Sequence, residues 1–251
     1  MKKLIFILAL SVVAMSCKKD DAGSATSITN VSSTYKVMVV EFTATWCSPC
    51  GAFGYPNWEA AHNNHPYKTT GISLHRADDI SDANSPAQVA LETYWGFSGS
   101  PSGAVNNGSA FYPTTVDNTV TSTLSGKIAN AGVGISKTLS GNTLTINTKS
   151  VFFNNVTGDV YLAVYVVEND IMNIQASQTG VVKHNHVFRG SANGTFGESI
   201  ASSPTKGKIV DGTYTFTVPS DVINSANLHV VAVLWTMAGG VPVTYINSNM
   251  D

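Results

Sequence analysis

The chain carries two cysteines three positions apart, Cys47 and Cys50, directly after an apolar segment of strand length. Residues 37–42 (VMVVEF) form that segment, which a single acid interrupts. A continuous apolar run of this kind is typical of a buried parallel strand. Residues 51–62 then show apolar side chains at helical spacing, although Pro56 should kink the helix. The pattern restricts this region to an α/β unit with both sulfur atoms near the start of its helix.

Two thiols at this spacing can form a disulfide and exchange it. The first lies at the helix start, where free N–H groups and the helix dipole favour thiolate over thiol. Half of a zinc site is the alternative interpretation, but zinc needs two further ligands. The third cysteine of the chain, Cys17, lies near the N-terminus, and no histidine pair with zinc-finger spacing follows Cys50. We therefore interpret the pair as a redox centre and expect neither a metal nor a cofactor.

Further elements complete the α/β unit. Residues 86–95 have both terminal signals of a helix, because Ser85 can cap its start and Gly96 can adopt the left-handed conformation at its end. Two more strands are expected, at residues 71–75 and 103–106. A third helix is predicted from apolar residues at every fourth position, which are Val116, Val120, Leu124 and Ile128. The order of these elements predicts an α/β domain over residues 35–129.

Residues 130–251 have a different pattern. Short segments alternate apolar and polar side chains or form apolar runs of strand length, with turn residues between them and no convincing helix. The expected strands are residues 142–149, 161–167, 213–218, 228–235 and 243–247. This pattern predicts an all-β antiparallel sandwich as the second domain.

The histidines give a weaker signal. His184 and His186 lie two positions apart, so on a strand they would share one face, which permits metal binding. Without a third ligand, a structural or solvent-facing role is preferred. His75 ends a predicted strand, and a place near the redox centre is the alternative to a role elsewhere.

The N-terminus predicts export. Residues 1–16 combine two lysines, a short apolar stretch and small residues, as a cleaved signal peptide does. The apolar stretch is far shorter than the ~20 residues of a membrane-spanning helix. Cleavage directly before Cys17 resembles the pattern of bacterial lipoproteins, in which this cysteine carries lipid; ordinary cleavage leaving an unmodified cysteine is the alternative. Residues 17–34 read as a flexible tether. Residues 18–21 (KKDD) fit either an outer-membrane sorting tag or a charged linker.

The charge of the chain limits its partners. The formal net charge is −2, and only 12% of residues are charged. Such a chain offers no electrostatic basis for binding nucleic acid. We expect envelope proteins with thiols or disulfides as partners, and a membrane contact through the lipid anchor.

Two segments resemble the thioredoxin family. Residues 39–50 (VVEFTATWCSPC) resemble its signature of apolar strand, buried acid, tryptophan and Cys-x-Pro-Cys, and residues 94–101 (YWGFSGSP) resemble the stretch that leads into its cis-proline. The resemblance implies that Cys47 is the nucleophile, Cys50 the resolving thiol and Glu41 the proton acceptor. Glu41 could instead only form a hydrogen bond with a neighbour.

The same resemblance implies a docking site for an extended substrate. Pro101, together with Ser100, would pair with the substrate, and Trp46 and Pro49 would contact it. Trp46 could equally serve packing, and Pro101 could be trans, as most prolines are. Pro56 stands one position later than the helix proline of thioredoxins, so the helix start could differ.

The second half resembles the outer membrane protein 28 family. The resemblance rests on residues 178–180 (QTG), 183–190 (KHNHVFRG) and 194–197 (GTFG), and it extends from Tyr35 to the C-terminus. It implies an outer membrane lipoprotein of a Gram-negative bacterium, with a thioredoxin-like domain followed by a β-sandwich. It implies little about activity, since binding or adhesion has been suggested for the family.

Two functions follow from these patterns. The leading hypothesis is a thiol–disulfide oxidoreductase of the cell envelope that acts through a mixed disulfide. The alternative is a surface-exposed binding or adhesion lipoprotein in which Cys47 and Cys50 form a structural disulfide. The sequence leaves open the redox direction, the electron partner, the substrate, the oligomeric state and the membrane face.

Overall fold

The computed structural model describes residues 28–81 and 85–251. The predicted signal peptide, Cys17 and most of the tether lie outside these residues. The helical elements are η1 (Cys50–Gly54), α1 (Tyr55–Asn64), α2 (Pro86–Trp95), η2 (Pro113–Thr115), α3 (Val116–Leu124) and η3 (Ser225–Asn227). The strands are β1 (Val37–Thr43), β2 (Thr69–His75), β3 (Ser102–Val105), β4 (Ala131–Ser140), β5 (Thr143–Phe152), β6 (Asp159–Glu168), β7 (Ile171–Ile174), β8 (Val181–His184), β9 (Val187–Ser191), β10 (Glu198–Ser202), β11 (Ile209–Thr217), β12 (Leu228–Ala238) and β13 (Val241–Met250).

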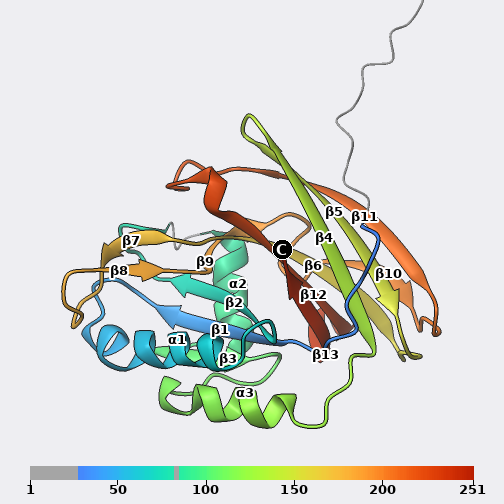
Figure 1. Cartoon of the computed structure of the whole chain (residues 1–251), viewed down its shortest axis with the longest axis horizontal. Helices are drawn as coiled ribbons and strands as arrows, with labels where there is room; N and C mark the ends of the chain where they lie inside the picture. The colour runs from blue at the N-terminus through green and yellow to red at the C-terminus, as the bar shows by residue number, and fades with distance from the viewer. Residues whose placement is uncertain (1–27, 82–84) are drawn as a thin grey trace, which may run out of the picture.

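One large sheet runs through the described part of the molecule (Figure 1). Its strand order is β13-β12-β6-β9-β2-β1-β3, and β10 also pairs with β6. β1 and β2 are parallel, whereas β3 is antiparallel to β1. The structure is thus rich in strands, and it joins an α/β part with a β part.

Helices cover both faces of the sheet at β1. Alternate side chains of a strand point to opposite faces, and Val37 and Val39 pack with Trp58 of α1 and Val120 of α3. On the other face, Phe42 and its neighbours two and four positions earlier pack with α2. Both faces of β1 are therefore buried, which explains its continuous apolar sequence.

The β part consists of two facing sheets. β11, β5 and β4 form a separate antiparallel sheet. Apolar side chains from this sheet share one core with alternate residues of β6 and β12. The other residues of β6 and β12 join the core under α2. As in β1, burial on both faces accounts for the apolar run in β6.

β9 connects the two halves of the chain. It belongs to the C-terminal half, yet it lies parallel to β2, with Val187 opposite Ser73. The Ser73 N–H donates to the carbonyl of His186 over 2.7 Å. Arg189 of β9 forms a fully buried ion pair with Glu168, at 2.7 Å between Nη2 and Oε2. Its Nη1 donates to the carbonyl of Ile80. The first half therefore receives a strand and a buried charge from the second.

The helices follow the sequence with one difference. α2 spans Pro86–Trp95 between the cap Ser85 and the left-handed Gly96, as predicted. Pro56 is the second residue of α1 and directly follows the change from the π-helical η1 to an α-helix. The prediction that the third helix extends to Ile128 is wrong. α3 ends at Leu124, before Gly126, whose φ of 66° is left-handed, and Ile128 is 78% exposed.

None of the helices within residues 28–81 and 85–251 has both the length and the apolarity needed to cross a bilayer.

Candidate redox centre

Cys47 and Cys50 form a disulfide at the start of the helical segment that follows β1. The two Cα atoms are 5.1 Å apart. The Cys50 N–H donates to Cys47 Sγ over 3.2 Å. The Gly51 N–H donates to the Cys47 carbonyl, also over 3.2 Å. Free N–H groups at a helix start favour negative charge, so Cys47 is the sulfur better placed to exist as a thiolate.

A π-helical turn shapes the segment after the disulfide. η1 spans Cys50–Gly54 and continues directly into α1. Its hydrogen bonds close over one residue more than those of an α-helix. The extra residue explains why Pro56 stands one position later than expected while Cys47 still lies at the helix start.

Pro101 lies next to residues 47–54, which we call the cysteine segment. The Ser100–Pro101 peptide bond is cis, as the resemblance to thioredoxins implied. A Cβ placed at Gly54 would lie 3.2 Å from Pro101 Cβ and 3.8 Å from both Cys50 Cβ and Glu41 Oε1. Pro101, Cys50 and Glu41 therefore meet around Gly54.

Trp46, Pro49 and Ser48 form the exposed rim of the centre. Trp46 is 62% exposed, whereas Cys47 is only 5% exposed and Cys50 is fully buried. The Trp46 ring N–H donates to the carbonyls of Arg76 and Ala77. These bonds hold the indole at the surface next to the disulfide.

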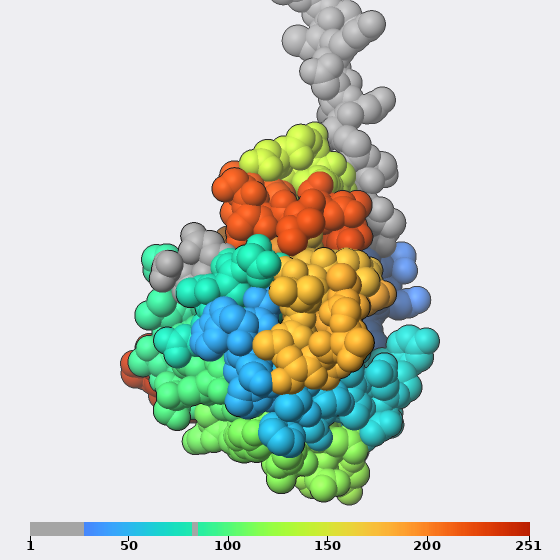
Figure 2. All heavy atoms as spheres, turned by 90° about the vertical axis from the view of Figure 1, so that its left-hand side faces the viewer, coloured from blue at the N-terminus to red at the C-terminus, as the bar shows by residue number. Residues whose placement is uncertain are grey.

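A loop from the second half of the chain covers the other side of the disulfide. β7 and β8 form a hairpin, and we call residues 175–178 at its tip the hairpin loop. Gln175 Nε2 donates to the carbonyls of Ala44, Thr45 and Cys47, at 3.1 to 3.2 Å. Figure 2 shows the hairpin, in yellow-orange, lying against the blue cysteine segment.

Further hydrogen bonds join the hairpin loop to the segment that carries the cysteines. The Ala176 N–H donates to the Thr45 carbonyl over 2.8 Å. Gln178 Nε2 donates to the Gly51 carbonyl over 2.7 Å. A Cβ at position 51 would lie 1.8 Å from the Ala176 oxygen, so this position requires glycine. Sequence reasoning missed this loop, since its residues carry no motif for contact with the cysteines.

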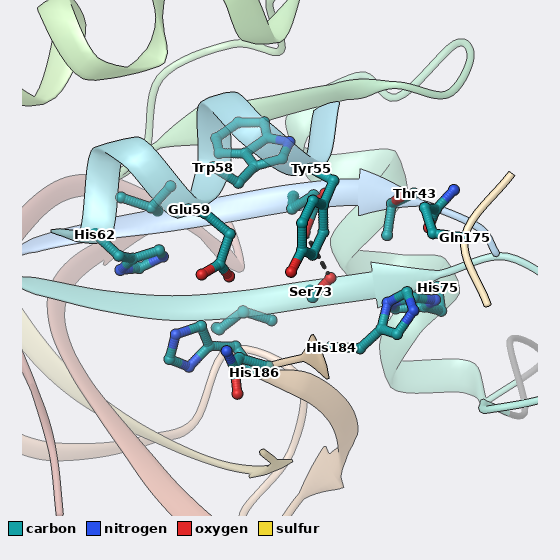
Figure 3. A pocket seen from close by; sticks show the side chains of 14 residues that line it. Thr43, Tyr55, Trp58, Glu59, His62, Ser73, His75, Gln175, His184 and His186 are labelled. Atoms are coloured by element: carbon teal, nitrogen blue, oxygen red, sulfur yellow. Dashed lines mark hydrogen bonds between the residues drawn. The ribbon is translucent and has the colours of Figure 1, made fainter. Parts of the chain in front are cut away.

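Glu41 lines a polar cavity, and Figure 3 shows this cavity from close by. Glu41 Oε2 accepts a hydrogen bond from Ser73 Oγ at 2.9 Å. Burial raises the pKa of Glu41 to about 7, although His75 and Ser73 oppose this shift. A carboxyl group with this pKa can accept or release a proton near neutral pH. The role of proton acceptor, which the resemblance to thioredoxins implies for Glu41, stays a prediction.

Histidines line the same cavity. His62, His75, His184 and His186 all contribute to its wall. The pKa values of His62 and His184 fall to about 4, mainly because burial disfavours the charged ring. Because His75 lines the cavity together with Glu41, it lies near the candidate redox centre. The Nδ1 atom of His75 is 2.7 Å from Asp78 Oδ2. The expectation that His184 and His186 share one strand is wrong, because β8 ends at His184 and His186 lies in a turn with φ of 60°.

No group of three or more metal-binding side chains occurs in the part of the chain that the structure describes.

Comparison with known proteins identifies the family. The sequence model of the family described as outer membrane protein Omp28 matches residues 88–249. The chain belongs to the Omp28 family. The family name points to an outer membrane protein of bacteria. The match starts after the cysteine segment, so it includes the hairpin loop but not the disulfide.

Two further similarities concern the redox centre and the fold. A thioredoxin of Ictalurus punctatus is 35% identical over 54 residues, which is 22% of this Omp28-family chain and 50% of that protein. The chain thus spans half the length of this thioredoxin. The structure of HBP35 of Porphyromonas gingivalis superposes with a TM-score of 0.71 and 17% identity, covering 88% of this chain and 76% of that one. This likeness shows a shared fold. Together, the thioredoxin match and the disulfide point to a thiol-related function.

Proposed function

We propose that this Omp28-family protein is a thiol–disulfide oxidoreductase that acts on thiols and disulfides of cell-envelope proteins. The observation that carries the proposal is the disulfide at the helix start, with Glu41 and Pro101 grouped behind Cys50. A structural disulfide needs neither a proton acceptor behind the second sulfur nor a helix start beneath the first.

The geometry supports the following reaction. The Cys47 thiolate attacks one sulfur of a partner disulfide, and the partner's other sulfur leaves as a thiolate. Glu41 takes the proton from the Cys50 thiol. The Cys50 thiolate then attacks Cys47 Sγ, which closes the Cys47–Cys50 disulfide and releases the second partner sulfur. Each released thiolate takes a proton from solvent. The reverse sequence oxidises a partner dithiol.

The two cysteines are expected to differ under substitution. In Cys50→Ser, Cys47 can still attack, but the mixed disulfide cannot resolve, so partners should accumulate as covalent adducts. In Cys47→Ser, no adduct should form. Non-reducing gels of envelope extracts would show this difference, and a reduction potential for the wild-type pair would give the direction. Equal behaviour of the two variants would contradict the assigned roles.

We also propose that lipid on Cys17 anchors the protein to the outer membrane. The support is the lipoprotein-like segment before Cys17 and the family name. Labelling with a radioactive fatty acid should mark the wild-type protein and leave Cys17→Ser unmarked. An unlabelled mature wild-type protein would exclude the anchor.

One observation favours a second function. The hairpin loop packs on the cysteine segment, and Cys47 is only 5% exposed. A disulfide that is held in this way could simply brace a surface binding or adhesion protein. In that case the purified protein should neither accept nor donate a disulfide at any cellular potential, whereas the oxidoreductase must exchange with small disulfides.

A further inference from the structure

The cavity that Glu41 lines contains a second acid, Glu59. The cavity lies between α1, the strands β1 and β2, and the turn from β8 to β9. Figure 3 shows Tyr55 and Glu59 pointing from α1 toward β2, on the side where Ser73 lies. The space between the side chains measures about 20 Å³, which is enough for one water molecule.

Two ring nitrogens at this cavity lack a partner. His184 Nε2 and His186 Nδ1 are buried, and neither has a hydrogen bond within the described residues. Buried polar atoms are almost always satisfied by protein or ordered water. Since both rings line the cavity, they point to a polar occupant. With no three-ligand metal group among the described residues, water is the occupant that fits.

Glu59 of α1 lines this cavity together with Glu41. It follows Tyr55 by four positions, so both side chains lie on one face of α1. Both acids are half-buried, but Glu41 is surrounded by more protein than Glu59. Burial raises the pKa of Glu59, while Asn185 and Lys183 lower it. The charge of Glu59 in turn raises the pKa of Glu41, so the two carboxylates are electrostatically coupled.

Other titratable side chains also face the cavity, and they come from α1, β2, β8 and the turn after β8. The titratable and charged residues that face the two carboxylates are Tyr55 and His62 of α1, His75 of β2, Lys183 and His184 of β8, and His186 of the following turn. Burial lowers the pKa values of His62, His184 and His186, so these rings are neutral near pH 7. Glu41 and Glu59 are the two acids that line this cavity.

We propose that Glu59 is the second proton carrier of the redox centre, which passes the proton of Cys50 from Glu41 to solvent. This inference rests on the proposed oxidoreductase function. Glu41 receives the proton when Cys50 becomes a thiolate. The proton then moves through the cavity to the Glu59 carboxylate, and Glu59 releases it to bulk water. Glu41 returns to its ionised form and is ready for the next turnover.

The test mixes the fully reduced protein with the aromatic disulfide of thionitrobenzoate. The measured quantity is the rate at which thionitrobenzoate is released. Attack by Cys47 releases the first thiolate, and attack by Cys50 releases the second. In Glu59→Gln the first phase should keep its rate, whereas the second should slow about tenfold, less than the hundredfold or more expected when the direct acceptor is removed in Glu41→Gln. Asp211→Asn, which removes an exposed acid of β11, should match wild type in both phases.

The pH profile separates a relay from a purely structural role. Without the Glu59 charge, the pKa of Glu41 should fall. The rate of the second phase, plotted against pH, should therefore have its midpoint at lower pH. Glu59→Asp keeps a carboxylate and should recover most of the rate. Wild-type rates and an unshifted midpoint in Glu59→Gln would overturn the relay. A wild-type protein that shows neither phase would instead refute the proposed function.

Discussion

Replacing Glu41 by glutamine should make the folded protein more stable at high pH. Glu41 lies behind Cys50 in the buried cavity, and burial raises its pKa to about 7, against 4.5 for the free carboxyl group. The ionised carboxylate is therefore less stable in the folded protein than in the unfolded chain. Below pH 4.5 the raised pKa does not reduce the free energy of unfolding. The reduction grows as the pH rises toward 7 and reaches its full size above pH 7.

The size of this effect follows from the two pKa values. One unit of difference corresponds to about 1.36 kcal/mol. Linkage over the interval from pH 5 to pH 8 then gives a loss of about 2–3 kcal/mol of unfolding free energy from Glu41 alone. The buried histidines act in the opposite direction, because their pKa values are lowered and folding disfavours their charged forms at low pH. Only the difference between wild type and Glu41→Gln isolates the carboxyl group.

Urea unfolding of the oxidised proteins at pH 5 and pH 8 measures that difference. The stability of Glu41→Gln relative to wild type should rise by about 2–3 kcal/mol between the two pH values. The Asp211→Asn control removes an exposed carboxylate and should show no such rise. A constant difference across this range would refute the idea that Glu41 is held protonated near neutral pH.

Two further predictions concern the contacts that hold the centre. Arg189→Met leaves the buried Glu168 without its cation, so urea unfolding should show a loss of about 3–5 kcal/mol; Lys183→Met, which removes an exposed pair, should unfold like wild type. An unchanged Arg189→Met would contradict the role of this ion pair. Gly51→Ala places a Cβ on the Ala176 oxygen, so hydrogen exchange of the hairpin-loop amides should become faster. Gly99→Ala meets no atom within 4 Å and should leave that exchange unaffected.

Local signals predicted the α/β part well. α2 illustrates this, because its cap, its first proline and its terminal glycine are each decided by backbone chemistry within a few residues. The cysteine segment is a second case, since its strand and helix start are adjacent in sequence. Ile128 shows the limit of such reasoning. Its fourfold spacing continues the helical pattern, but the left-handed Gly126 lies between it and Leu124 and its side chain is 78% exposed, so the spacing alone misplaced the end of α3.

The rest depends on contacts between residues distant in sequence. Gln175 lies 128 positions after Cys47, and no local pattern predicts its bond to that carbonyl. Likewise, β9 looks like any short strand until it pairs with β2. The cavity residues on α1 carry a readable signal, because Tyr55, Glu59 and His62 recur at helical spacing above an acid in the preceding strand. The sequence does not show that β8 and the turn after it form the opposite wall of the same cavity.

Because β9 and the hairpin loop come from residues 171–191, the redox centre depends on a late part of the chain. During synthesis, the cysteines emerge well before Gln175, Ala176 and the strand that flanks β2. Until then the cysteine segment lacks the hydrogen bonds that Gln175 and Ala176 donate, and the cavity lacks one wall. The sulfur pair therefore acquires its mature surroundings only after more than half of the polypeptide has followed it, so the proposed thiol exchange would have to await residues 171–191.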